Sequence, residues 1–147
     1  MTTQEVLNLN KAVIESWNSH SAEKFLSLCT DDIVWRDIAN PEPSKGKQGA
    51  KDFYEMWNIA FPDFKMVLLN TIANETSVAS EIEFTGTNNG PLRMPGQPEI
   101  AATKKTVSKM RGCYFAKVKN GKVTEVNTYP DMMYMMSQLG LMQEQHA

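Results

Sequence analysis

Residues 103–129 read TKKTVSKMRGCYFAKVKNGKVTEVNTY, two runs of alternating apolar and polar residues on either side of Asn120-Gly121. Asn-Gly is a preferred pair for the two-residue turn of an antiparallel hairpin, because both central positions of that turn need positive φ angles. The stretch therefore predicts a hairpin with strands at about 103–119 and 123–129. One parity of the first strand holds the side chains that we expect to face inward: Met110, Gly112, Tyr114, Ala116 and Val118.

The rest of the sequence predicts four helices and three further strands. Apolar residues recur at helical spacing in four segments, at about 6–17, 21–28, 47–60 and 132–141. Alternation of period two predicts three further strands, at about 33–37, 64–72 and 77–87. The long connection at 86–102 contains three glycines and three prolines, and connections of this length often form a lid or a pocket rim. This order predicts one α+β domain over residues 1–147, a curved sheet wrapped around helices.

Composition limits the class of protein. The 147 residues are 41% apolar, which suits one soluble domain with its own core. The net charge of −2 gives no indication of nucleic acid or an anionic membrane as partner. Cys29 and Cys113 stand in apolar contexts, which favours two reduced, packed thiols over a disulfide. The sequence shows no secretion signal and no membrane-spanning stretch, so we expect a cytoplasmic protein.

Residue patterns for metals and phosphates are not found in the sequence. His20 lies in a predicted loop and His146 near the end of the chain, and the two cysteines lack any ligand spacing. A glycine-rich phosphate loop and a Gly-x-Ser-x-Gly elbow are also missing. We therefore expect neither a metal nor an organic cofactor.

Asp131 stands between the last predicted strand and the methionine-rich final helix. Aspartate is preferred at the N-cap of a helix, where its side chain accepts a backbone N–H. A carboxylate beside an apolar pocket could instead act as an acid/base group, because loss of surrounding water makes it a stronger base. The residues alone leave both roles open.

Several ordered motifs resemble one known family. They are Phe61-Pro62-Asp63-Phe64, Gly86-Thr87-Asn88-Asn89-Gly90, Asn120-Gly121-Lys122-Val123, and Tyr129-x-Asp131 followed by Gln138-Leu139-Gly140-Leu141. Together with the element order, they resemble the SnoaL-like polyketide cyclase family of the NTF2-like superfamily, from about residue 5 to 142. The resemblance implies a cone-shaped barrel around an internal apolar cavity, usually in a homodimer. It also implies that Asp131 is the acid/base catalyst of an aldol ring closure without a cofactor.

The sequence departs from the family pattern at one position. The family has Gly-Thr-His-x-Gly where this chain has Asn88 in place of the histidine. Asn88 can donate a hydrogen bond to a ligand, but it cannot carry a proton. A second carboxylate, Asp37, shares the inward parity of Ile33 and Trp35, and related steroid isomerases place a base aspartate at about this point. A salt bridge or a loop hydrogen bond is the alternative role for Asp37.

The expected pocket has further candidate ligand-binding residues. Asn127 and Tyr129 share a strand face with Asp131 if the strand is regular, and Tyr114 adds a hydroxyl donor. Trp17, Trp35 and Trp57 have core spacing, and in a hollow barrel core side chains also form the pocket wall.

The pocket residues predict a small apolar or aromatic carbonyl compound as ligand, and the family resemblance implies a homodimer, which we expect to form through the outer face of the sheet. The leading function is a cofactor-free aldol cyclase or isomerase, with Asp131 and Asp37 as candidate catalytic residues. The alternative is a non-catalytic ligand-binding protein. Epoxide hydrolysis ranks last, because it needs an Asp–Arg–Asp set and both Arg36 and Arg111 have outward parity.

Overall fold

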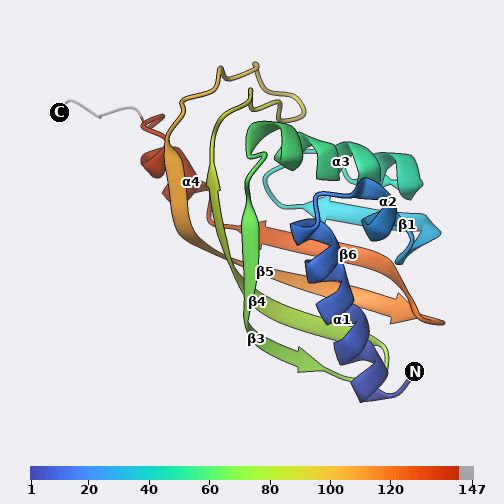
Figure 1. Cartoon of the computed structure of the whole chain (residues 1–147). Helices are drawn as coiled ribbons and strands as arrows, with labels where there is room; N and C mark the ends of the chain where they lie inside the picture. The colour runs from blue at the N-terminus through green and yellow to red at the C-terminus, as the bar shows by residue number, and fades with distance from the viewer. Residues whose placement is uncertain (143–147) are drawn as a thin grey trace.

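A computed structural model describes residues 1–142, so His146 lies outside the described residues (Figure 1). The helices are α1 (Thr3–Asn18), α2 (Ala22–Leu26), α3 (Gly46–Ala60) and α4 (Met132–Gln138). The strands are β1 (Cys29–Asp37), β2 (Ser44–Lys45), β3 (Lys65–Ala73), β4 (Ser77–Thr87), β5 (Thr106–Lys119) and β6 (Lys122–Pro130). The predicted α+β class is confirmed, and the two-residue strand β2 is an element that the sequence did not reveal.

The strands form one curved sheet in the order β2-β1-β6-β5-β4-β3. The four strands from β3 to β6 pair antiparallel with their neighbours, as predicted, whereas β1 pairs parallel with β6. Helices α1 and α3 lie over the same face of the sheet, and α4 lies beside β5 (Figure 1). The sheet therefore has one face covered by helices and one outer face.

The turn between β5 and β6 has the geometry that the sequence predicted. Asn120 has φ 50° and Gly121 has φ 79°, so both central residues have positive φ, as a type I′ hairpin requires. At the other end of the chain, α1 begins at a capping box in which the Thr2 and Glu5 side chains satisfy each other's backbone N–H groups.

A bulge in β6 changes which of its side chains face inward. The β5–β6 register shifts so that Lys117 pairs with Glu125 while Val118 pairs with Val123. This shift buries both Val123 and Val126, which are three residues apart, and leaves Glu125 outside in ion pairs with Arg36 and Lys117.

The bulge corrects the predicted position of two candidate residues. From Val126 onward the inward residues are Thr128 and Pro130, so Asn127 and Tyr129 face outward. Tyr129 is 49% exposed. The expectation that Asn127 and Tyr129 line the pocket assumed a regular strand and is wrong for that reason.

An aromatic cluster centred on Trp17 packs the helices against the sheet. The Trp17 ring lies 4.7 Å from Tyr54 on α3, 5.3 Å from Phe25 on α2 and 5.6 Å from Trp35 on β1, measured between ring centroids. Edge-to-face and tilted arrangements at these distances are favourable for aromatic pairs. One side chain thus connects three other elements and holds α1 at a fixed height above the sheet.

The two cysteines differ in their surroundings. Both are free, and Cys29 is buried as expected, whereas Cys113 lies exposed on the outer face of β5. Burial raises the pKa of the Cys29 thiol to about 12, so this thiol is unreactive at neutral pH. Among the described helices, none combines the length and the apolar character that a membrane span requires.

Candidate active site

A cavity of about 100 Å³ lies between the inner face of the sheet and helices α1 and α3. Its wall is apolar over most of its area, and the three tryptophans of the chain, Trp17, Trp35 and Trp57, all line it. The oxygen-bearing side chains in the wall are those of Asn10, Asp37, Tyr114 and Thr128.

Strand register explains how the polar side chains come together. Asp37 on β1 pairs with Thr128 on β6, and Thr128 pairs with Tyr114 on β5. Tyr114 pairs with Ser80 on β4, which pairs with Thr71 on β3. Paired residues on neighbouring strands point to the same side of a sheet. A row of polar side chains therefore crosses five strands beneath an otherwise apolar cavity.

Asp37 is the carboxylate of this row and is only 8% exposed. Its Oδ1 accepts the Ala39 backbone N–H at 2.8 Å, and its Oδ2 accepts the Thr128 hydroxyl at 2.7 Å. None of the ion pairs among residues 1–142 involves Asp37. The loop hydrogen bond expected as an alternative role is thus present, and Asp37 also lines the cavity. Each oxygen keeps a lone pair beyond its one partner.

Tyr114 is held by a second hydrogen-bonded group. Its hydroxyl donates to Asn10 Oδ1, and Asn10 Nδ2 donates to Ser80 Oγ at 3.1 Å. Burial raises the pKa of Tyr114 to about 12, although hydrogen bonds with Ser80 and Asn10 act in the opposite direction. The hydroxyl is therefore neutral, and its single proton is already donated to Asn10. Tyr114 thus presents an acceptor oxygen to the cavity, where the sequence suggested a donor.

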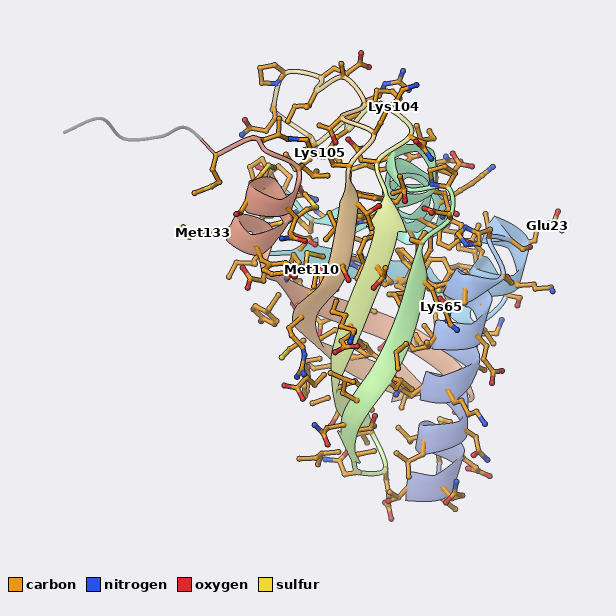
Figure 2. The ribbon with its side chains drawn as sticks, turned by 60° about the vertical axis from the view of Figure 1, so that its left-hand side comes forward. Glu23, Lys65, Lys104, Lys105, Met110 and Met133 are labelled. Carbon is orange, nitrogen blue, oxygen red and sulfur yellow. The ribbon has the colours of Figure 1, made fainter. Side chains whose placement is uncertain are left out.

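Asp131 has the N-cap role that its sequence context allowed. It is exposed, and its Oδ1 accepts the Tyr134 backbone N–H at 3.0 Å, which makes it the N-cap of α4. It is not among the residues that line the cavity. Figure 2 shows Met133 on the side of α4 that points away from β5, and Met133 is 70% exposed. The position of Asp131 therefore supports the N-cap role and gives no support to an acid/base role beside the apolar pocket.

Asn88 is fully buried but lies outside the cavity wall. Its Nδ2 donates to the carbonyl oxygens of Ala60 and Gly90, at 3.1 and 3.0 Å. Its Oδ1 accepts the Thr103 backbone N–H at 2.8 Å and the Thr103 hydroxyl at 2.9 Å. These bonds use the whole amide group to fasten the long connection before β5 to the end of α3. Asn88 therefore has no free donor or acceptor group for the ligand contact that the sequence predicted.

Sequence reasoning missed two polar residues of the cavity wall. Asn10 stands between Leu9 and Val13 on the buried stripe of α1, so a polar residue inside an apolar stripe was the available signal. Thr128 was not a candidate, because a regular strand that turns Asn127 and Tyr129 inward would turn Thr128 outward; the available signal was the spacing of Val123 and Val126, which breaks the period of two.

Three comparisons relate the chain to known proteins. A family model described as SnoaL-like polyketide cyclase matches residues 8–139. No curated protein matches the chain. A candidate SnoaL-like polyketide cyclase from Jannaschia sp. CCS1 has 14% identity and a TM-score of 0.82, covering 96% of this chain and 95% of that one.

Two further solved structures have a similar fold. AclR, a candidate hydroxylase from Streptomyces galilaeus, has 22% identity and a TM-score of 0.79, covering 99% of this chain and 87% of that one. A candidate ketosteroid isomerase from Kribbella flavida has 16% identity and a TM-score of 0.64, covering 87% of this chain and 78% of that one. At these identities the structural likeness shows the fold alone.

Replacement of Asn88 tests its role as an anchor of the long connection. Asn88→Ala leaves the Gly90 carbonyl and the Thr103 amide without partners and removes one of the two hydrogen bonds to the Ala60 carbonyl, so we expect the free energy of unfolding to fall by about 2–3 kcal/mol. Urea denaturation followed by circular dichroism measures this change. The neighbouring Asn89 is exposed, so Asn89→Ala should change stability by less than about 0.5 kcal/mol. Equal effects of the two substitutions would contradict this role.

The pH dependence of stability tests the environment of Tyr114. Its pKa in the folded protein lies above the ordinary 10.0, so folding favours the neutral phenol. The corresponding stability is complete below pH 10 and is lost as the pH rises toward 12, by about 2–3 kcal/mol. Tyr114→Phe should remove this part of the decline in urea denaturation measured from pH 9 to 12. A difference between the two proteins that stays constant over that range would contradict the assigned environment.

Proposed function

The chain belongs to the SnoaL-like polyketide cyclase family, and on that premise we propose that it is a cofactor-free acid/base catalyst acting on a carbonyl compound, with Asp37 as the catalytic base. One observation carries the proposal: among residues 1–142, Asp37 is the sole carboxylate in the wall of a largely apolar cavity. Such a wall excludes water from the reacting atoms and leaves the carboxylate as the group that can accept a proton.

The proposed step begins with removal of a proton from the carbon next to the carbonyl group. The proton goes to Asp37, and the electron pair of the C–H bond moves onto the carbonyl oxygen as an enolate. In an isomerase, Asp37 returns the proton to another carbon. In an aldol cyclase, the enolate carbon attacks a second carbonyl group of the same molecule, and the proton goes to the new alkoxide. Both reactions need one base in apolar surroundings, which the cavity wall supplies, and neither requires a metal or an organic cofactor.

Hydrogen bonds prepare Asp37 for this role. Thr128 and the Ala39 amide each hold one carboxylate oxygen, so the group has a fixed direction before a substrate enters. A preorganised base avoids the entropic cost of orientation during the reaction. Asp131 has no comparable access, because it is exposed at the start of α4. The catalytic assignment therefore passes from Asp131 to Asp37.

Epoxide hydrolysis has no support from the positions of the arginines. Arg36 pairs with Glu125, and Arg111 lies near Glu81 and Glu83. Neither arginine lines the cavity, so the water-positioning Asp–Arg–Asp set is not assembled there. A non-catalytic binding protein remains the rival function, and the exchange experiment below separates it from the enzyme.

Deuterium exchange tests the proposed proton transfer without knowledge of the natural substrate. In D₂O, the protein should accelerate exchange of the α-protons of one or more of cyclohexanone, 2-decalone and acetophenone, followed by proton NMR. Asp37→Asn should slow this exchange by about 10²- to 10⁴-fold, the usual contribution of a general base. Asp131→Asn is the matched control, since asparagine also caps helices, and it should leave the rate unchanged.

Two results of this experiment would reject the enzyme. If none of the three ketones exchanges faster than in buffer, the protein binds ligands without catalysis. If Asp37→Asn exchanges as fast as the unaltered protein, the base is another group.

We also propose a homodimer formed through the outer face of the sheet. Phe115 and Tyr129 are 38% and 49% exposed on adjacent strands of this face, and large exposed apolar side chains are typical of interfaces. Double replacement by lysine, Phe115→Lys with Tyr129→Lys, should convert the dimer to a monomer in analytical ultracentrifugation. Ile59 on α3 is 44% exposed on the other side of the molecule, so Ile59→Lys should leave the dimer intact. A monomeric unaltered protein would contradict this proposal.

A further inference from the structure

We propose that His20 is a pH-sensitive latch between the α1–α2 turn, helix α3 and the start of β3. The latch is closed when the imidazole ring carries two protons, and it loosens when the ring loses one of them. It is independent of the proposed function, because none of the residues that form it takes part in the acid/base step.

The His20 ring contacts two other elements through its two nitrogen atoms. Nδ1 lies 2.7 Å from Asn58 Oδ1 on α3, and Nε2 lies 3.0 Å from the carbonyl oxygen of Phe64, which directly precedes β3. The ring also packs edge-to-face against the Phe64 ring, with 4.5 Å between the centroids. One side chain therefore joins the α1–α2 turn to α3 and to the segment that leads into β3.

Both ring nitrogens face an oxygen that can only accept a hydrogen bond. The Phe64 carbonyl has no proton to donate, and the Asn58 amide is oriented by its other bond, in which Nδ2 donates to the Tyr54 carbonyl at 2.9 Å. A flipped amide would place Asn58 Oδ1 against that carbonyl oxygen. An imidazolium ring has two N–H donors, whereas a neutral ring has one and leaves a lone pair facing the second oxygen. The two contacts are thus complete only in the protonated ring.

The backbone at His20 indicates that the side chain is the reason for a histidine at this position. His20 has φ 57°, in the left-handed region that glycine adopts freely and that is costly for a residue with a Cβ atom. It follows the C-cap residue of α1, a position where glycine is the usual residue. An imidazole that binds two other elements offsets this backbone cost.

The ring makes its contacts with uncharged groups. It is exposed, so it exchanges protons with the solvent and follows the pH of the solution. Within residues 1–142, no ion pair includes His20. Burial raises the pKa of Tyr54 above its ordinary 10.0, so the Tyr54 hydroxyl stays neutral where imidazole titrates. The charged residues on the neighbouring turns are Glu15 on α1, Glu23 and Lys24 on α2, Glu55 on α3, and Asp63 and Lys65 beside Phe64.

The latch adjoins the cavity wall. Trp17, three residues before His20, and Met66, two residues after Phe64, both line the cavity. The Asn18 side chain accepts the Met66 backbone N–H at 2.7 Å and donates to the Met66 carbonyl at 2.8 Å. Release of His20 thus weakens the junction that holds two residues of the wall in place.

The latch stabilises the folded protein more at low pH than at high pH. The ring meets its two acceptors only in the folded chain, so folding favours the protonated ring. This stabilisation is complete at low pH and is lost as the pH rises through the range of about 5–8, where imidazole titrates.

Thermal unfolding of His20→Asn tests this sign. Asparagine tolerates positive φ, so the variant loses the ring without new backbone strain. At pH 5.5 the unaltered protein should melt about 2–4 °C above His20→Asn, the effect of one hydrogen bond in a chain of this length. At pH 8.5 this difference should be less than half as large. A difference that stays constant from pH 5.5 to 8.5, or that grows with pH, would overturn the latch.

Asn58→Ala separates the latch from an ordinary hydrogen bond of the ring. Without Asn58 Oδ1, a neutral ring can donate from Nε2 to the Phe64 carbonyl and leave Nδ1 to water. The difference in melting temperature between Asn58→Ala and His20→Asn should therefore be constant over the same pH range, although His20 is still present. If Asn58→Ala keeps the pH dependence of the unaltered protein, the pair of acceptors is not its cause and the proposal fails.

Proton NMR of ¹⁵N-labelled protein reports the ring protons directly. His20 and His146 are the two histidines of the chain, so His146→Gln leaves the signals of His20 alone. At pH 5.5 two ring N–H signals should be visible, because each proton is held in a hydrogen bond, and at pH 8.5 at most one. Fewer than two N–H signals at pH 5.5 would contradict the doubly bonded ring.

Discussion

The parallel pairing of β1 with β6 is the constraint on which the site depends. It places Asp37 directly beside Thr128, so the threonine hydroxyl reaches the carboxylate at 2.7 Å. The same ladder continues across β5, where Tyr114 is the next residue in the row. Without this pairing, Asp37 would end an edge strand in contact with water. With it, a carboxylate is held in the wall of an apolar cavity.

Two polar groups of the cavity wall have different capacities. Asp37 keeps free lone pairs, whereas Tyr114 has a neutral hydroxyl whose proton is donated to Asn10. Asp37 can thus accept a proton, and Tyr114 can accept a hydrogen bond. The carboxylate meets the first requirement of carbonyl enolisation, and the apolar remainder of the wall excludes water.

Much of the fold could be predicted because local patterns agreed with each other. The Asn120-Gly121 turn, the alternation in β5 and the apolar stripe of α1 each point to the element that the structure contains. The parallel β1–β6 pair could not be read in this way, because it joins segments about 90 residues apart. The bulge that turns Thr128 inward also depends on the neighbouring strand. For this reason Asn127 and Tyr129 were assigned to the wrong face.

The site was predictable in part, and the errors in its prediction have physical causes. Asp37 and Trp35 had the correct strand parity, and Trp17 and Trp57 had the correct helical spacing, so regular periodicity was sufficient to place them in the wall. Asp131 and Asn88 were assigned to the ligand, but each meets the needs of nearby backbone groups, at a helix start and at a long connection.

A crystal structure of the protein with cyclohexanone bound tests the central claim most directly. The account predicts the ligand inside the cavity, with one carboxylate oxygen of Asp37 about 3–3.5 Å from the α-carbon, which is the separation of reacting atoms before proton transfer. A ligand bound outside the cavity, or with its α-carbon out of reach of Asp37, would contradict the account.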